Sequence, residues 1–546
     1  MSSPVATAPF ATVYEAFRHT AAAHPENAFL AVPRDAKRDY HPDGFETTYG
    51  AAAEEVERLI AQYRAAGYGI GHRVALMLDN RPEHFLHMLA LNALGVSQVP
   101  VNPYYLHHEL SYQLTHSEVD LAIGLASNRV RLEAVAAERA APLPIATLED
   151  WPEALPAPAR PAMAGTRGRK TETAVIYTSG TTGRPKGCLI DNDYMIAVGQ
   201  WYAEIGGRLT LEHGRERLFV PLPVFHVNAG INTPTALILT ANCLIMPDRF
   251  HPSTWWRDLA ETRATGLHYL GVVPTILLKA APCPEETQHR VKFGLGAGVD
   301  PDLHAKFEER FGIPMVEVWG MSETGRFFAD CHEPRQIHTR AFGRPTPDFE
   351  AKVVDDAGRE VPRGTPGELV VRSPEPEPRK GFFAGYLKDP AATEEVWRGG
   401  WFHTGDVVTQ AEDGMLHFVE RKKNIIRRSG ENISAAEVEN ALIDHAAVGQ
   451  IAVMPVADEL RDEEVLACVV PAAGWAAGAE TARAILEFGR TRCAYYKLPG
   501  WIVFLDDLPR TGTEKIQKHL IFPGGQDPRA HAGAVDLRAL KKRQPA

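Results

Sequence analysis

The chain has 546 residues, of which 45% are hydrophobic and 23% are charged, and its formal net charge is −11 at pH 7. This composition is typical of a soluble globular protein, and the length allows two or more domains, each with its own core. Because the acidic residues are spread along the chain and no extended basic face is visible, a nucleic-acid-binding protein is not indicated.

The cysteines indicate a reducing compartment. Six of them are scattered without CxxC spacing, which favours reduced thiols in a cytoplasmic enzyme over a disulfide framework. Residues 1–17 lack a basic segment followed by an apolar one, so no signal peptide is expected. The apolar run at 234–247 is too short and too polar to span a bilayer, and it predicts a buried strand or helix.

The first part of the chain alternates between helical and extended patterns. Apolar residues recur at helical spacing in 11–25 and 51–67. A strand at 72–80, a helix at 82–95 and a strand at 97–102 follow, and the order repeats near 118–126. This order predicts a βαβ-type parallel sheet.

The middle of the chain repeats this alternation of strands and helices, and the C-terminal part has a different pattern of elements. We expect strands at 267–274, 292–298 and 315–320, with a helix at 301–312. Short β-runs begin near 346. Beyond residue 424 we expect a compact α+β segment with helices at 434–445 and 481–491 and strands at 449–455, 465–470 and 500–505. We place a short joint near 421–424 and predict domains at 1–422 and 423–546.

The stretch "AVIYTSGTTGRPKGC" (174–188) begins as a strand and continues as a polar loop. Glycines allow close approach of the backbone to an anion, and successive N–H groups with hydroxyls form a phosphate-sized nest. The loop is not a Walker A loop, and a plain polar turn is the alternative. The residues that would form the nest are Thr178, Ser179, Gly180, Thr181, Thr182, Gly183 and Lys186.

The stretch "VWGMSETG" (318–325) places a carboxylate just after a predicted strand. Glu323 would suit magnesium, which takes oxygen ligands. The alternative is a G-x-S-x-G nucleophile elbow with Ser322 as the nucleophile, although the second glycine stands one place too late.

Two later segments also present polar groups. Asp406, in "WFHTGDVV", and Arg421, in "HFVERKKN", would together hold a ribose diol, although an Asp in a turn and an Arg at a strand end are each common. The loop "LPRTGTEKIQK" (508–518) presents Lys515, which by itself is an ordinary solvated lysine. The segment "CHEPRQIH" (331–338) matches no zinc spacing.

These four segments, in this order, resemble the acyl-adenylate-forming (AMP-binding) superfamily, which includes acyl-CoA synthetases, adenylation domains of peptide synthetases and beetle luciferases. The resemblance covers about residues 10–520, with further agreement at "PLPVFHVNAG", "GAGVD", "GELVVRS" and "GYLKDP". The segment "ERKKNIIRRSGENISAAEVEN" looks most like bacterial medium-chain and carnitine/crotonobetaine-type CoA ligases.

The resemblance implies an α/β fold: a large N-terminal domain of βαβ-type sheets with a distorted β-barrel subdomain, and a small mobile α+β C-terminal domain. It implies an AMP-forming acid–thiol ligase, an acyl-CoA synthetase of carboxylic or fatty acid metabolism. The substrates would be ATP with Mg²⁺, coenzyme A and a small-molecule carboxylic acid. No nucleic acid or membrane span is expected, and a homodimer is allowed.

The resemblance also implies a role for each matching residue. The nest and Lys186 would bind the ATP phosphates. Four residues would be catalytic: Thr182, His226, Glu323 and Lys515. The adenine and ribose would contact Gly296, Ala297, Gly298, Trp319, Gly320, Met321, Ser322, Asp406 and Arg421. Glu323 would hold the metal. His226 would stand at the gate to the acyl pocket, Lys423 at the hinge and Gly430 beside the pantetheine tunnel.

Several alternatives remain open at this point. Ser322 stands where many relatives have Thr, and the tail beyond residue 520 has no functional account. The acceptor of the acyl group would be coenzyme A or a free carrier protein. Two other functional classes are a serine hydrolase and a non-catalytic nucleotide-binding protein. The sequence does not identify the acid: aromatic residues at 201, 202, 225, 327 and 328 would favour a bulky acid, cage a quaternary ammonium group, or belong to the core.

Overall fold

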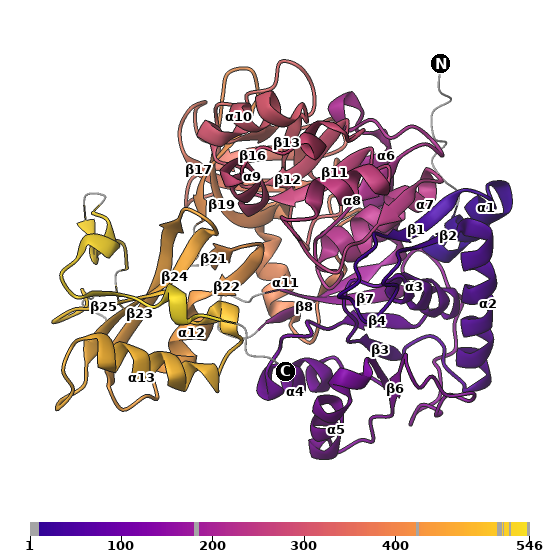
Figure 1. The fold of residues 1–546 in the computed structure, drawn as a ribbon, viewed down its shortest axis with the longest axis horizontal. Coiled ribbons are helices and arrows are strands. Elements are labelled where there is room, and N and C mark those ends of the chain that lie inside the picture. The colour runs from indigo at the N-terminus through magenta and orange to yellow at the C-terminus, as the bar shows by residue number, and fades with distance from the viewer. Residues whose placement is uncertain are drawn as a thin grey trace. The chain divides into compact units, whose positions relative to one another are not determined.

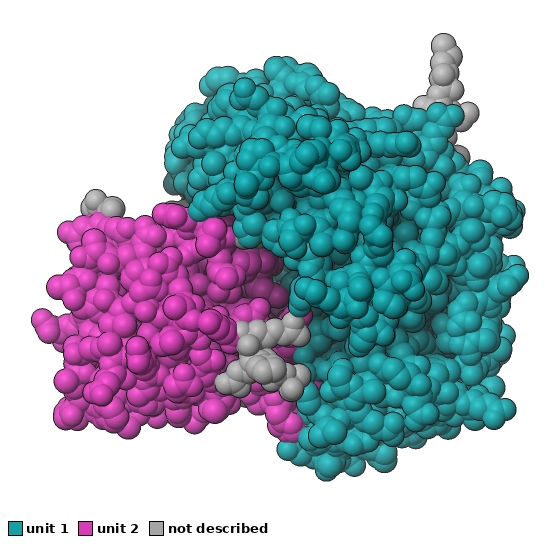
Figure 2. All heavy atoms as spheres, viewed as in Figure 1, with its two compact units in different colours: residues 1–103, 113–176, 187–420 teal, residues 104–112, 177–186, 421–546 magenta. Residues whose placement is uncertain are grey.

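The computed structural model describes residues 10–178, 185–421, 425–509, 516, 518–523 and 526–542. Its internal contacts divide the chain into two compact units (Figures 1 and 2). Unit 1 comprises residues 1–103, 113–176 and 187–420, and unit 2 comprises residues 104–112, 177–186 and 421–546.

A seven-stranded sheet is built from the N-terminal part of the chain, in the order β18-β8-β7-β4-β3-β5-β6. Strands β3 to β7 pair in parallel, which confirms the predicted βαβ pattern. Helix α3 is buried on nearly all sides; it begins at Pro82 and ends at Gly95, whose φ of 72° closes the helix. The elements are β3 (Arg73–Leu76), α3 (Pro82–Leu94), β4 (Ser97–Pro100), α4 (His107–His116), β5 (Leu121–Gly124), α5 (Arg129–Glu138), β6 (Ile145–Thr147), β7 (Glu172–Thr178), β8 (Lys186–Asp191) and β18 (Gly385–Tyr386).

An eight-stranded sheet has the order β14-β13-β12-β11-β9-β10-β1-β2. Its six inner strands are parallel and its two edge strands are antiparallel. The strands are β1 (Ala28–Val32), β2 (Phe45–Thr48), β9 (Arg217–Phe219), β10 (Cys243–Ile245), β11 (Gly266–Leu270), β12 (Phe293–Ala297), β13 (Met315–Trp319) and β14 (Phe328–Ala329). The helices are α1 (Val13–Ala23), α2 (Tyr49–Ala65), α6 (Asn192–Glu204), α7 (Thr233–Leu239), α8 (Trp255–Glu261), α9 (Val272–Lys279) and α10 (Pro301–Phe311).

Two predicted segments differ in detail from the structure. The strand expected at 267–274 ends at Leu270, because helix α9 begins at Val272. The apolar run at 234–247 contains both a helix and a strand, α7 and β10, separated by a turn at Ala241 with a φ of 55°. Strands β1 and β2 were not predicted; β1 pairs with β10, which lies far along the chain, and β2 pairs with β1 at the edge of the sheet.

A five-stranded sheet, β15-β20-β19-β17-β16, corresponds to the expected distorted barrel. Residues of β19 alternate between buried and partly exposed, as a strand that covers a core on one face requires. The elements are β15 (Ala341–Gly343), β16 (Glu350–Val354), β17 (Gly367–Arg372), α11 (Pro390–Val396), β19 (Phe402–Gln410) and β20 (Leu416–Arg421).

Most of unit 2 is an α+β fold with its own apolar core. Its strands are β21 (Ile425–Arg428), β22 (Glu431–Ser434), β23 (Val448–Asp458), β24 (Asp462–Pro471), β25 (Trp501–Phe504) and β26 (Ala534–Asp536), and its helices are α12 (Ala435–Leu442) and α13 (Ala479–Arg490). The tail is part of this fold, because β26 pairs with β25, Leu537 is buried in the core and the Lys541 ammonium pairs with Glu464. In the described part of the chain, no helix is both long enough and apolar enough to cross a membrane.

Candidate active site

In unit 1, the candidate nucleotide-binding segments lie at the carboxyl ends of neighbouring parallel strands. Gly296 and Ala297 end β12, Gly298 follows it, and Trp319 ends β13. Strands β12 and β13 are neighbours in the sheet (Figure 1), and Gly296 pairs with Glu317. In open α/β sheets, ligands bind at this edge. The expected adenine-binding segments are therefore adjacent strand ends.

The glycines of the turn at 296–298 are required by close backbone approach. A Cβ on Gly296 would lie 2.3 Å from the carbonyl oxygen of Tyr269, and Gly298 has a φ of 84°, where other residues are strained. A Cβ on Gly271 would lie 1.9 Å from the carbonyl oxygen of Gly298. The turn is thus packed directly against the end of β11.

A half-buried carboxylate that the sequence analysis did not identify fixes the same turn. Glu317 Oε2 accepts a hydrogen bond from Gly298 N at 2.8 Å, and Oε1 accepts one from the Tyr269 hydroxyl at 2.6 Å. Burial raises the pKa of Glu317, and these hydrogen bonds oppose that effect. The sequence feature that points to this role is a Glu within a strand that is predicted to be buried.

Trp319 and Asp406 come from different sheets and make direct contact. The indole Nε1 donates to Asp406 Oδ2 at 2.8 Å, and both residues are buried. The Trp319 ring also stacks with Phe328, at a centroid distance of 5.6 Å. The structure therefore brings together the expected adenine-contacting and ribose-contacting residues.

The Glu323 carboxylate is buried and held by a second residue that the sequence analysis missed. The Tyr386 hydroxyl donates to Glu323 Oε1 at 2.8 Å. Burial, followed by the negative charge of Glu323, raises the pKa of Tyr386. The loop backbone is fixed as well, because Phe383 N donates to the Glu323 carbonyl at 3.0 Å and the Tyr194 hydroxyl donates to the Thr324 carbonyl at 3.0 Å.

Ser322 lies in the turn that precedes Glu323, half-buried. Among the described residues, no histidine forms a hydrogen bond with its hydroxyl, whereas a nucleophilic serine needs a base within such reach. This arrangement offers no support for the hydrolase alternative.

His226 lies in the loop between β9 and a π-helix at Asn228–Asn232. Its ring packs against Phe225 at a centroid distance of 4.7 Å, and its carbonyl accepts from Gly230 N at 2.9 Å. A Cβ on Gly230 would lie 2.0 Å from the Val224 carbonyl oxygen, so the tight turn requires glycine.

Four of the expected site residues are described in unit 2. Thr178 ends β7, Lys186 begins β8, and Gly430, with a φ of 90°, forms the turn between β21 and β22. Arg421 is described only as the last residue of β20. Ser179, Gly180, Thr181, Thr182, Gly183, Lys423 and Lys515 lie outside the described residues.

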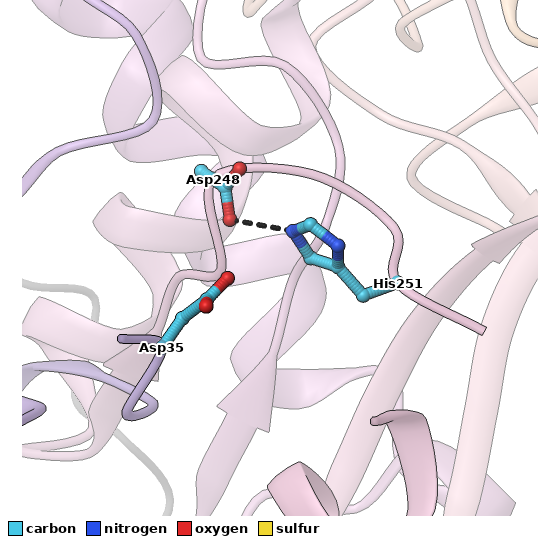
Figure 3. A group of neighbouring side chains, drawn as sticks. All are labelled: Asp35, Asp248 and His251. Carbon is cyan, nitrogen blue, oxygen red and sulfur yellow. Dashed lines mark hydrogen bonds and ion pairs between the residues drawn. The ribbon is translucent and has the colours of Figure 1, made fainter. Parts of the chain in front are cut away.

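A separate group with metal-ligating chemistry comprises Asp35, Asp248 and His251 (Figure 3). His251 Nε2 lies 2.8 Å from Asp248 Oδ1, and Arg249 Nε lies 3.7 Å from Asp248 Oδ2. Asp35 Oδ1 accepts from Lys37 N at 2.9 Å. Asp248 is thus paired with a neighbouring histidine and arginine, and Asp35 accepts from a backbone amide, so the group alone does not indicate a metal site.

Comparison with known proteins identifies the family of the chain. The family model described as AMP-binding enzyme matches residues 17–387, and the model described as AMP-binding enzyme C-terminal domain matches residues 437–515. The sulfoacetate–CoA ligase of Cupriavidus necator is 31% identical, over 91% of this chain and 95% of its own length. The crotonobetaine/carnitine–CoA ligase of Proteus mirabilis is 27% identical, over 87% and 92%.

A similar solved structure is the amide bond synthetase McbA from Marinactinospora thermotolerans. Its TM-score is 0.78 at 25% identity, and the match covers 93% of this chain and 98% of that one. The resemblance drawn from the ordered motifs is thereby confirmed, as is the fold class. The chain belongs to the AMP-binding enzyme family, in its acyl-CoA synthetase branch.

Proposed function

We propose that this chain is an ATP-dependent acyl-CoA synthetase. A carboxylate oxygen of the acid attacks the α-phosphorus of ATP, and the bond to pyrophosphate breaks. The thiol of coenzyme A then attacks the carbonyl carbon of the acyl-adenylate, loses its proton, and AMP leaves. The observation that carries this proposal is the Trp319–Asp406 contact beside the turn at 296–298, in a chain of this family.

In unit 1, several described residues would bind the nucleoside of ATP. The turn at 296–298 and Trp319 contact the adenine, together with the backbone of Gly320, Met321 and Ser322. Asp406 accepts from the ribose hydroxyls, with Arg421 as its expected partner. Because Glu317 fixes the turn and Trp319 fixes one oxygen of Asp406, little rearrangement is needed on binding.

Glu323 fits a magnesium ion, since it is a buried carboxylate oriented by a hydrogen bond from Tyr386. When bound, Mg²⁺ neutralises phosphate charge during nucleotidyl transfer. We assign the phosphate nest of Thr178 to Gly183, with Lys186, to the pyrophosphate leaving group. We assign Lys515 to the contact with both the acid carboxylate and the α-phosphate.

The negative charges of the acid and of ATP explain why a cation is needed in addition to Mg²⁺. Two unit charges 4 Å apart interact by about 4 kcal/mol at an effective dielectric near 20, so two unscreened anions would approach slowly. Lys515 would supply positioning and electrostatic stabilisation. A rotation of domain 423–546 about Lys423 would then exchange the lysine face for the pantetheine path beside Gly430.

The test is a product analysis with purified protein, ATP, Mg²⁺, coenzyme A and a panel of carboxylic acids. We expect AMP, pyrophosphate and an acyl-CoA thioester in equal amounts. Parallel reactions with free acyl carrier proteins or amines would identify a different acceptor, since hydroxylamine would then trap the adenylate while coenzyme A gave no thioester. Hydrolysis of esters without ATP, with Ser322 labelled by a fluorophosphonate, would refute the proposal.

A further inference from the structure

A buried polar network lies next to the His226 loop, between helix α6 and strand β11. The Tyr202 hydroxyl lies 3.0 Å from His268 Nε2, and His268 Nδ1 lies 2.8 Å from Asn228 Oδ1. Because the Asn228 oxygen can only accept, His268 carries its proton on Nδ1, and its Nε2 accepts from Tyr202. This chain of three groups fixes the orientation of the Asn228 amide.

The network consists of uncharged groups. His268 is fully buried, and burial lowers its pKa to about 3, so the ring is neutral at physiological pH. The second acceptor bond of Asn228 Oδ1 comes from the Thr233 hydroxyl at 3.3 Å. The Asn228 side-chain nitrogen makes no hydrogen bond to any residue that the structure describes.

Asn232, one turn further along the π-helix, is 4% exposed, and neither Oδ1 nor Nδ2 has a hydrogen-bond partner among the described residues. Leaving a buried polar group without a hydrogen-bond partner destabilises the folded protein. A π-helix is rare and frequently marks a functional site. Asn228 and Asn232 begin and end this five-residue π-helix, immediately after His226.

A series of contacts connects this network to the nucleotide-binding segments. Trp201 neighbours Tyr202 and meets Phe327 edge-on at a centroid distance of 5.1 Å. The Phe327 ring covers Gly320, where a Cβ would lie 1.6 Å from Phe327 Cδ1. The polar network is therefore packed near the segment that follows Trp319, where the adenylate forms.

We infer that the amides of Asn232 and Asn228 recognise an uncharged hydrogen-bonding substituent on the acyl part of the acid. This inference rests on the proposed function and names its substrate class: acids that carry a hydroxyl or carboxamide group beyond the reacting carboxylate. An amide offers both a donor and an acceptor, which matches such a group. Tyr202, His268 and Asn228 carry no charge, so they would give a sulfonate or a quaternary ammonium no counter-charge, and burying such an ion costs more than burying a neutral group.

The test compares matched pairs of acids by kcat/KM for AMP release with coenzyme A: ω-hydroxyhexanoate against hexanoate, and para-hydroxybenzoate against benzoate, with sulfoacetate and carnitine as charged probes. In the wild type, we expect the hydroxylated member of at least one pair to be preferred by about tenfold or more, since a site built to hydrogen-bond a hydroxyl rejects the analogue that lacks it. A preference for the unsubstituted or the charged acids would overturn the inference.

The decisive variant is Asn232→Leu. We expect it to reduce the ratio within the preferred pair at least about tenfold, while the KM for ATP stays unchanged and the unsubstituted acid is still used. The matched control is Gln98→Leu, because the Gln98 amide is also buried without a partner among the described residues but lies within β4 of the seven-stranded sheet.

The possible outcomes distinguish a failure of this inference from a failure of the proposed function. An unchanged ratio in a folded Asn232→Leu enzyme overturns the inference, and so does an equal change in Gln98→Leu. If Asn232→Leu does not fold, Asn232→Ser is used in the same comparison. If no acid gives AMP release with coenzyme A in the wild type, the proposed function itself fails, which is a different result.

Discussion

The Trp319 indole nitrogen donates a hydrogen bond to Asp406 over 2.8 Å and thereby joins strand β13 of the eight-stranded sheet to strand β19 of the five-stranded sheet. A charge-assisted hydrogen bond of this kind is strong, and it holds the carboxylate in one orientation. The two sheets thus contribute one residue each to the proposed nucleoside-binding site.

The variant Trp319→Phe keeps an aromatic ring and removes the donor. A hydrogen bond to a charged group contributes about 1.5–3 kcal/mol, so we expect the KM for ATP to rise about tenfold to a hundredfold. ATP-dependent pyrophosphate exchange measures this. Trp475→Phe, at a position that is 42% exposed, is the matched control. An unchanged KM for ATP in a folded Trp319→Phe enzyme would contradict the role assigned to this contact.

The variant Tyr386→Phe tests the magnesium assignment. It removes the hydroxyl that donates to Glu323 Oε1 at 2.8 Å and leaves the packing almost unchanged. Loss of such an orienting group typically lowers metal affinity about 10–100-fold, so the Mg²⁺ concentration for half-maximal activity should rise about tenfold or more. A Mg²⁺ titration at saturating ATP measures the shift. If only the Tm falls, Tyr386 has a structural role alone.

The fully buried His84 predicts a loss of stability in acid. Burial lowers its pKa to about 3, and neither ring nitrogen has a hydrogen-bond partner among the described residues. The unfolded chain takes up a proton below its ordinary pKa of about 6.5, whereas the folded chain does not. The stabilising effect is therefore complete above pH 6.5 and decreases as the pH falls towards 3.

The variant His84→Phe should remove that pH dependence. Between pH 7 and pH 5, the free energy of unfolding should fall by about 2 kcal/mol less than in the wild type. Urea unfolding at the two pH values measures the difference. The exposed His338→Phe is the control, and an equal change in both variants would exclude His84 as the cause.

The two lysines outside the described residues should separate the half-reactions. We expect Lys515→Ala to reduce pyrophosphate exchange at least about 10²-fold, the scale of losing one preorganised donor. We expect Lys423→Pro to preserve exchange and to impair thioester formation, because it restricts the proposed hinge. Equal loss of both half-reactions in Lys423→Pro would argue against a hinge at this position.

The sequence predicted the parts of the site that lie in ordered local motifs. The turn at 296–298 and Trp319 stand at strand ends, and Glu323 follows in the turn after β13, where local patterns indicate both the strand and the residues after it. Asp406, expected just after a glycine turn, lies instead within strand β19. In unit 2, helices α12 and α13 and strands β23, β24 and β25 were predicted within a few residues, because their apolar periodicity is strong, whereas β21 and β22 were not predicted.

The residues that the sequence did not reveal act through long-range contacts. Tyr386 reaches Glu323 across 63 positions of the chain, and His268 reaches Tyr202 across 66. Nothing in the local pattern distinguishes such residues from ordinary core positions. For the same reason β26 was missed, since its strand character depends on pairing with β25.

The most direct measurement of the central claim is the nucleotide product formed with an accepted acid and coenzyme A. The account predicts that one AMP and one pyrophosphate appear for each acyl-CoA thioester, and that no nucleotide is consumed when the acid is omitted. Formation of ADP and phosphate, or thioester formation without ATP, would contradict it.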